Sequence, residues 1–195
     1  MTKAAIGFRA HSGWAMLAAV AGTVKSPIVI KRRRIELIER GVPKQPYHAA
    51  KDLPLPDAEA LIQRCMDVAT RLAEIAIRKC IDDLRSDGYI VDRFGVLLGS
   101  GRPIGDLTKV LASHPMLHTA EGVLIRNALR EAGQNCGLAV SGVKEKELYD
   151  IAASRYRLPI DELRRLVTEA GRGIGPPWGQ DQKDAALVAW LSLGG

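Results

Sequence analysis

The order of strand and helix patterns in this sequence predicts an α/β fold: a five-stranded mixed sheet flanked by helices, with extra helices at the C-terminal end. The first 40 residues hold three apolar or β-branched runs separated by short loops, which indicates an antiparallel meander. Two further apolar runs each follow a helical pattern, as in the β-α-β crossovers of a mixed sheet. The predicted order is therefore β-β-β-α-β-α-β, followed by helices.

Three short strands are expected at the start of the chain, over residues 4–8, 14–21 and 28–38. The third contains the run KRRR, residues 31–34, whose side chains would point alternately to the two faces of the sheet. Charges on both faces indicate an edge strand or a strand with one side open to water. The same run is a candidate stripe of phosphate contacts, with a solvated edge as the alternative.

A long, proline-bearing connection over residues 39–57 precedes the first long helix. Its length exceeds that of an ordinary connection, which favours a functional loop. Asp57 is the predicted cap of a helix that extends to about residue 87, because apolar residues recur there at helical spacing. We expect this helix to cover one face of the sheet. The apolar run at 89–98 then predicts a strand buried on both faces.

The second half of the chain is predicted to be mostly helical. Thr119 is the expected N-cap of a helix over 119–132, and GLAVSGV, residues 137–143, is the expected fifth strand. Later helices are expected at 145–155, 159–170 and 181–193. A chain of 195 residues is long enough to bury a core. We expect one domain over 1–195, with a core of 1–143 and a C-terminal helical part of 144–195.

The composition is that of a globular protein with a basic surface. The net charge of +6 and the isoelectric point near 9.4 favour polyanionic partners such as DNA or RNA, although a solvated basic surface is the plainer explanation. Three cysteines without C-x-x-C spacing indicate reduced thiols in a cytoplasmic protein. No secretory signal is recognisable, and the apolar run from Trp14 is too short to span a bilayer, so no membrane association is expected.

The stretch AIGFRAHSGWAML, residues 5–17, places Arg9, His11 and Ser12 inside an apolar run. It is similar to the first hairpin of RuvC-type Holliday-junction resolvases, in which a strand carries G-I-D-P-G and a T-G-W-A segment opens the next strand. Residues 118–148 and 181–193 resemble that family's second crossover and its terminal D-x-x-D-A-L-A helix. The resemblance implies the ribonuclease-H-like fold, whose element order is the one predicted above.

A weaker, topological similarity connects the sequence with the middle domain of class-one peptide release factors. That domain also has a basic third strand, a proline-bearing loop, a long helix and a strand that ends in a G-S segment, here Gly99 and Ser100. The G-G-Q motif of that family is absent, and Gln45 stands alone in the loop. The release-factor chemistry is therefore not expected here.

The resolvase resemblance implies four carboxylates that hold two Mg²⁺ ions, and the sequence departs from that pattern. Phe8 and Arg9 stand where the first strand should present an acid, and LLGSGRP has none at the end of the fourth strand. Asp181 and Asp184 match the last pair and lie on one face of a helix. We expect Arg9 to replace the charge of a metal ion by pairing with Asp184 or Asp181.

Two classes of function remain open, with a non-catalytic protein-interaction scaffold as a third. The first is a nucleic-acid-associated protein that lacks the full nuclease centre. It would bind DNA or RNA through Arg32, Arg34, Lys44 and Arg102. The second is an active hydrolase or nuclease with a rearranged centre and Mg²⁺ or Mn²⁺. Its candidate catalytic residues are Asp181, Asp184, His118 and Glu121. The cofactor, the substrate and the oligomeric state are not determined by the sequence.

The run SHPMLHTAEG, residues 113–122, has histidines spaced H-x₃-H followed by Glu121. Two histidines four apart on a helix can bind a metal, and His11 or His48 would supply a third ligand. The proline in this run and the predicted cap at Thr119 favour a loop there. Polar histidines in a loop are therefore the favoured interpretation, with a metal site as the alternative. GSGRPIGD, residues 99–106, is a candidate anion cradle, with a plain turn as the favoured alternative.

Overall fold

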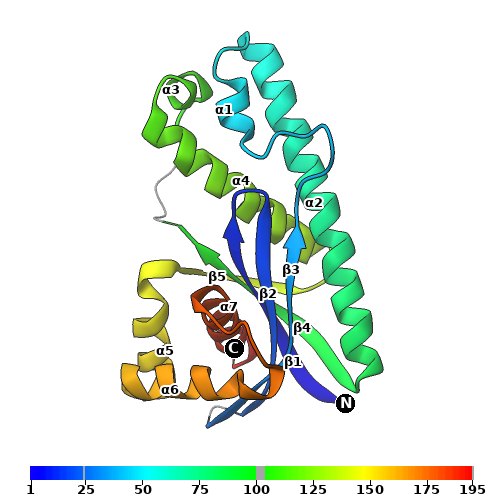
Figure 1. Cartoon of the computed structure of the whole chain (residues 1–195), viewed down its shortest axis with the longest axis vertical. Coiled ribbons are helices and arrows are strands. Elements are labelled where there is room, and N and C mark those ends of the chain that lie inside the picture. Colours follow the sequence, from blue (N-terminus) through cyan, green and yellow to red (C-terminus); the bar gives the residue numbers. More distant parts are fainter. Residues whose placement is uncertain (24, 100–103, 195) are drawn as a thin grey trace.

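The computed structural model describes residues 1–23, 25–99 and 104–194. Its strands form one mixed sheet in the order β3-β2-β1-β4-β5 (Figure 1). The β1–β2 and β2–β3 pairs are antiparallel, whereas β4 lies parallel to β1 and to β5. The predicted mixed sheet of five strands is confirmed, with three strands before the long helix and two after it. The strands are β1 Thr2–His11, β2 Trp14–Thr23, β3 Ser26–Glu36, β4 Tyr89–Leu98 and β5 Ala139–Lys144.

Helices cover both faces of this sheet (Figure 1). The helices are α1 Pro46–Ala50, α2 Leu55–Ser86, α3 Leu107–Leu111, α4 His114–Asn135, α5 Leu148–Tyr156, α6 Ile160–Ala170 and α7 Gln180–Leu193, with single turns η1 Glu145–Glu147 and η2 Arg172–Ile174. The long helix α2 and α4 pack on one face, as expected for α2, and α7 packs on the other with α5 and α6. Within the described ranges, no helix is both long and apolar enough to cross a membrane.

The alternation of side chains along β1 decides what reaches each face. Ile6 and Phe8 enter the core beneath α2 and α4. Gly7 faces α7, and a Cβ there would lie 2.2 Å from the carbonyl oxygen of Ala185, so only glycine admits the helix so closely. Arg9 lies on the same face two residues later. The close approach at Gly7 therefore brings the first turn of α7 to the side chain of Arg9.

β3 is an edge strand, which explains its charged run. Lys31 and Arg33 turn toward α2, where their side-chain nitrogens lie 2.8 Å and 3.6 Å from Oδ2 of Asp83. Arg32 and Arg34 lie on the opposite face. The run therefore divides between the two faces as the alternation predicts, and half of it serves to fasten the edge strand to α2.

Two helix starts differ from those predicted. α4 begins at His114, not at Thr119, and the hydroxyl of Thr119 donates to the carbonyl of Pro115 within the helix. Proline is compatible with the first turn of a helix, where its missing N–H has no helical partner to lose. α2 likewise begins at Leu55 after Pro54, which places Asp57 inside its first turn instead of at the cap.

The predicted long loop and the predicted fully buried strand are also corrected. Residues 46–50 of the loop form the short helix α1, which packs against α2 and α4. β4 is buried over residues 94–97, whereas residues 89–93 are half-buried or exposed. α7 approaches β4 at Gly95, where a Cβ would lie 2.6 Å from the carbonyl oxygen of Val188. Residues 89–93, the first half of β4, lie beyond the point where α7 contacts the strand.

Candidate functional site

A single arginine joins three carboxylates where the end of β1 meets the start of α7. Its Nε lies 3.1 Å from Oδ1 of Asp181, and its Nη2 donates to Oε1 of Glu145 at 2.7 Å. Its Nη1 donates to Oδ2 of Asp184. The planar guanidinium presents five N–H donors in a fixed fork, so it can serve several carboxylates at once. We call Arg9, Glu145, Asp181 and Asp184 the Arg9 cluster.

Local structure explains how these residues converge. Asp181 and Asp184 are three positions apart in the first turns of α7, so their side chains share a face. Glu145 opens η1 directly after β5. Gln180 donates from Nε2 to Oδ1 of Asp184 at 2.6 Å, which holds that carboxylate in place from within α7. The cluster thus draws on the ends of two strands and one helix.

The carboxylate of Asp184 is the most buried member of the cluster, with its side chain 5% exposed. Burial raises the pKa of Asp184 above its ordinary value. The charge of Arg9 and the hydrogen bond from Gln180 oppose this rise, whereas the charges of Glu145 and Asp181 add to it. Three carboxylates thus share one arginine, and Asp184 in particular needs a nearby cation to remain ionised.

The Arg9 cluster does not fit the Mg²⁺ or Mn²⁺ ions of a two-metal nuclease centre. Mg²⁺ requires oxygen ligands that are free to face it in near-octahedral geometry. Here both carboxylate oxygens of Asp184 already accept hydrogen bonds, from Arg9 and from Gln180. The fixed charge of Arg9 also stands where such an ion would lie, so we derive no metal-dependent step at this cluster.

A second cation lies at the end of β4, where the resemblance implies an acid. A Cβ on Gly99 would lie 2.9 Å from Nη1 of Arg126, so this guanidinium packs directly on the strand end. Burial lowers the pKa of Arg126, and the charge of Glu145 opposes that effect. The guanidinium of Arg126 is therefore within electrostatic reach of the Arg9 cluster, which makes the surroundings still less suited to a divalent cation.

A cleft of about 560 Å³ opens on the Arg9 cluster. It is lined by Arg9, Gly99, Glu145, Lys146, Tyr149, Gln180 and Asp184. Burial, and next the charge of Asp184, raise the pKa of Tyr149, so its phenol is neutral. The walls therefore carry charges of both signs beside a neutral hydroxyl, a lining that suits polar contacts.

A stacked row of side chains extends from the cluster across the sheet. The rings of His11 and Trp14 are parallel within 6° with centroids 4.0 Å apart, and the guanidinium carbon of Arg34 lies 4.0 Å from the Trp14 centroid. Nε2 of His11 lies 3.1 Å from Oδ1 of Asp181, at ion-pair distance but without hydrogen-bond alignment. The row joins β1, β2 and β3 on the face of the sheet that carries α7.

The structure places His118 and Glu121 outside the Arg9 cluster, in a separate group. Both belong to α4, which covers the face of the sheet opposite to α7, and both lie beside His48 of α1. Asp181 and Asp184 instead contact Arg9. Among the described residues, no hydrogen bond or ion pair joins the two groups, so the four candidate catalytic residues are divided between two separate groups.

The candidate nucleic-acid contacts have different surroundings. Arg34 and Lys44 are exposed, and Arg34 pairs with Glu36 at 2.7 Å. Arg32 is half-buried and donates from Nη2 to the carbonyl of Pro176 at 2.6 Å, so it fastens β3 to the loop before α7. Arg102 lies outside the described residues, as does part of the candidate anion cradle at 99–106.

Comparison with solved structures decides the fold. No family model and no curated protein matches the chain. A structure of Thermus thermophilus RuvC in complex with a Holliday junction substrate is 11% identical with a TM-score of 0.56, over 96% of this chain and 90% of that one. The chain has a RuvC-like, ribonuclease-H-like fold. A second Thermus thermophilus RuvC structure is 12% identical with a TM-score of 0.54, over 97% of this chain and 91% of that one.

Two residues at or beside this site were not among the sequence candidates. Glu145 stands in the charged run KEKE, which looks like an ordinary solvated turn, although it directly follows the fifth strand. Strand ends are where open α/β sheets usually bind ligands, and this position was the available signal. Arg126 lies in the middle of α4 and carries no such signal, because its role depends on the backbone of Gly99.

Proposed function

We propose that this chain binds structured nucleic acid through its RuvC-like fold and does not cleave it by a two-metal mechanism. The observation that carries the proposal is the contact of one guanidinium with three carboxylates in the Arg9 cluster. A fixed cation at this position offsets the negative charge permanently, so the carboxylates are not available to a metal. The RuvC structure found by comparison is itself in complex with a Holliday junction substrate.

Charge and geometry support a polyanionic ligand. The chain carries a net charge of +6. A Cβ on Gly13 would lie 3.1 Å from Cγ of Lys44, so this lysine rests on the turn between β1 and β2. Arg34 lies over Trp14, which follows the same turn. Two exposed cations therefore flank the hairpin that also carries Arg9, and phosphate groups are the ligands that such cations favour.

The first test is salt-dependent binding. The full chain is expected to bind a four-way DNA junction at low salt, with an affinity that falls linearly on logarithmic axes as salt rises, because bound phosphates release counterions. Arg34→Ala and Lys44→Ala should each reduce the steepness of that line by about 1. Arg85→Ala removes the same charge from an exposed position in the last turn of α2 and is the matched control.

Fluorescence anisotropy with labelled junction, duplex DNA and RNA distinguishes the possible ligands. Absence of binding to all three at low salt would contradict the proposal and favour the protein-interaction scaffold. Equal effects of Arg34→Ala and Arg85→Ala would show that binding follows the net charge alone and would remove the hairpin from the proposed interface.

One observation favours the alternative, an active hydrolase. His11 lies beside Asp181 of the Arg9 cluster, and an imidazole next to a carboxylate can act as a general base. Cleavage of junction DNA, RNA or a generic phosphoester by the full chain would support this alternative. Inertness toward all three with Mg²⁺, Mn²⁺ or Zn²⁺, together with salt-dependent binding, would support the binding function.

A further inference from the structure

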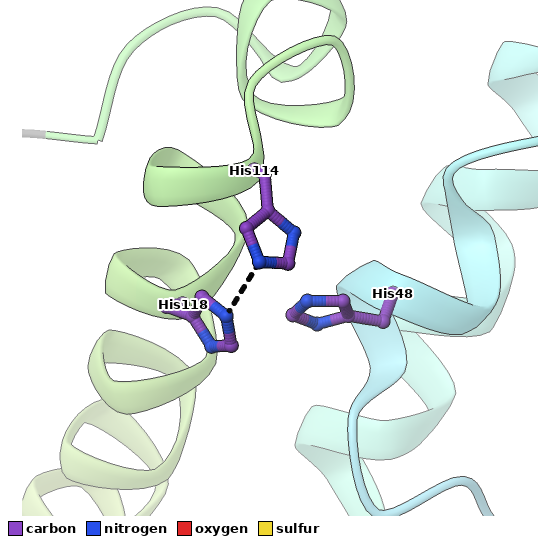
Figure 2. Close-up of side chains that lie close together, drawn as sticks. All are labelled: His48, His114 and His118. Carbon is purple, nitrogen blue, oxygen red and sulfur yellow. Dashed lines mark hydrogen bonds between the residues drawn. The ribbon is translucent and has the colours of Figure 1, made fainter.

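Three of the four histidines of the chain meet between α1 and the start of α4, outside the Arg9 cluster. His114 and His118 lie one turn apart at the start of α4, and His48 faces them from α1 (Figure 2). The ring centroid of His48 lies 5.5 Å from that of His114 and 4.7 Å from that of His118. One ring nitrogen of each histidine lies within 4.8 Å of the other two. We call these three residues the histidine cluster.

A buried carboxylate orients the first of these rings. Glu121 is 3% exposed, and its Oε1 accepts from the backbone N–H groups of Tyr47 and His48 at 2.9 Å and 3.1 Å. The same oxygen lies 3.2 Å from Nδ1 of His48. Because Oε1 already accepts from two backbone N–H groups, it is an acceptor toward the ring as well, and Nδ1 of His48 carries the proton. Its Nε2 is then left with a free lone pair.

One pair of nitrogens within the cluster has the spacing of metal ligands. Nε2 of His114 and Nε2 of His118 lie 3.2 Å apart. Two nitrogens bound tetrahedrally to Zn²⁺ lie about 3.3 Å apart, because each Zn–N bond is about 2.0–2.1 Å long. A carboxylate that fixes the tautomer of a ligating histidine is also the usual partner of such a site. Glu121 has that position relative to His48.

We propose that His48, His114 and His118 bind one divalent transition-metal ion, with Zn²⁺ as its natural test ligand. Three imidazoles suit Zn²⁺, Cu²⁺ or Ni²⁺ and not Mg²⁺, which prefers oxygen. The three protein ligands leave a fourth tetrahedral position open to water or to another ligand. The ion would also join α1 to α4 and so fix the proline-bearing connection against the body of the fold.

The proposal is independent of the Arg9 cluster and of nucleic-acid binding. His11, the fourth histidine, stacks on Trp14 and lies outside the histidine cluster, so its replacement controls for the loss of any imidazole. His114 and His118 are exposed, and their replacement by alanine removes no core contact. Glu121→Gln keeps the shape of the side chain and removes the charge that orients His48.

The test is Zn²⁺ titration of the chelator-treated full chain in competition with a chelating dye, with Co²⁺ absorption as a second readout. One Zn²⁺ per chain is expected. Loss of an outer-shell partner typically weakens metal binding 10–100-fold, so Glu121→Gln should fall in about that range. His114→Ala and His118→Ala remove ligands themselves and should each weaken binding by at least about 100-fold. His11→Ala should bind like the wild type.

Circular dichroism of every variant separates loss of the site from loss of the fold. A folded His114→Ala or His118→Ala protein that binds Zn²⁺ as tightly as the wild type would overturn the proposal, as would a wild-type chain without stoichiometric binding. A tetrahedral Co²⁺ spectrum that disappears in both folded variants and persists in His11→Ala would support it.

Discussion

Arg9→Ala is expected to lower the free energy of unfolding by about 3 kcal/mol near neutral pH, because it leaves three carboxylates without their shared cation. Removing one partner of a buried ion pair costs about 3–5 kcal/mol. Asp184 is buried, whereas Asp181 and Glu145 are 31% and 45% exposed and are partly screened by water. The lower end of the range therefore applies. Urea unfolding followed by circular dichroism measures the difference.

Arg85→Ala is the matched control, because it removes an arginine from an exposed position in the last turn of α2, away from the Arg9 cluster. Its effect should remain within about 0.5 kcal/mol, as for other surface substitutions. An Arg9→Ala protein as stable as this control would contradict the role of Arg9 as the shared cation. The comparison also excludes a general effect of reducing the net charge by one.

The same variant should regain stability in acid and in the presence of divalent cations. The pKa of Asp184 is raised in the folded state, so protonation favours folding. This contribution is lost as pH rises from the unfolded value, about 3.9, through the folded value, and it returns as pH falls. Without Arg9 the pKa rises further, so the deficit of Arg9→Ala should be smaller near pH 4 than at pH 7.

Mn²⁺ or Mg²⁺ should raise the melting temperature of Arg9→Ala more than that of the wild type. The freed carboxylates of Asp181, Asp184 and Glu145 then offer the hard oxygen ligands that these ions prefer. Thermal unfolding with and without each ion measures the effect. Equal responses of the two proteins would show that Arg9 does not stand in for a metal ion, even if the alanine variant is destabilised.

Gly7→Ala is expected to destabilise the fold by about 3 kcal/mol or more, because it drives a methyl group into the backbone of α7. The new Cβ would lie 2.2 Å from the carbonyl oxygen of Ala185 and 2.6 Å from the backbone nitrogen of Ala189. Backbone atoms of a buried helix cannot rotate away, so α7 must separate from β1. The first turn of α7 would then move away from Arg9.

Gly173→Ala is the control for this substitution, because a Cβ at that position meets no atom within 4 Å. Urea unfolding of both variants, with soluble yield as a second measure if Gly7→Ala fails to refold, separates the contact from a general effect of losing a glycine. A Gly7→Ala protein of wild-type stability would show that α7 and β1 lie farther apart than the structure places them.

The local structure of the histidine run differs from the one that the sequence predicts, because it is helical from His114 onward. The H-x₃-H spacing is visible in the sequence, yet Pro115 and the expected cap at Thr119 favoured a loop. Proline in the first turn of a helix is compatible with either interpretation, because that position needs no N–H donor. Only the packing of α1 on α4 decides it, since Glu121 then accepts from the first N–H groups of α1.

Local periodicity by itself determined the order of strands and helices along the chain, the long helix on one face and the exposed edge of the sheet, because these depend on which residues alternate or recur. The resolvase resemblance, and not periodicity, indicated that Arg9 and the D-x-x-D pair could meet. The tertiary structure alone decided that Glu145 and Arg126 lie at or beside that centre, that His118 and Glu121 lie outside it, and that His48 completes a cluster with His114 and His118. Those residues come from elements far apart in the chain. Their meeting depends on how the helices pack against the sheet and against one another. No periodic pattern within a short stretch of sequence specifies that packing.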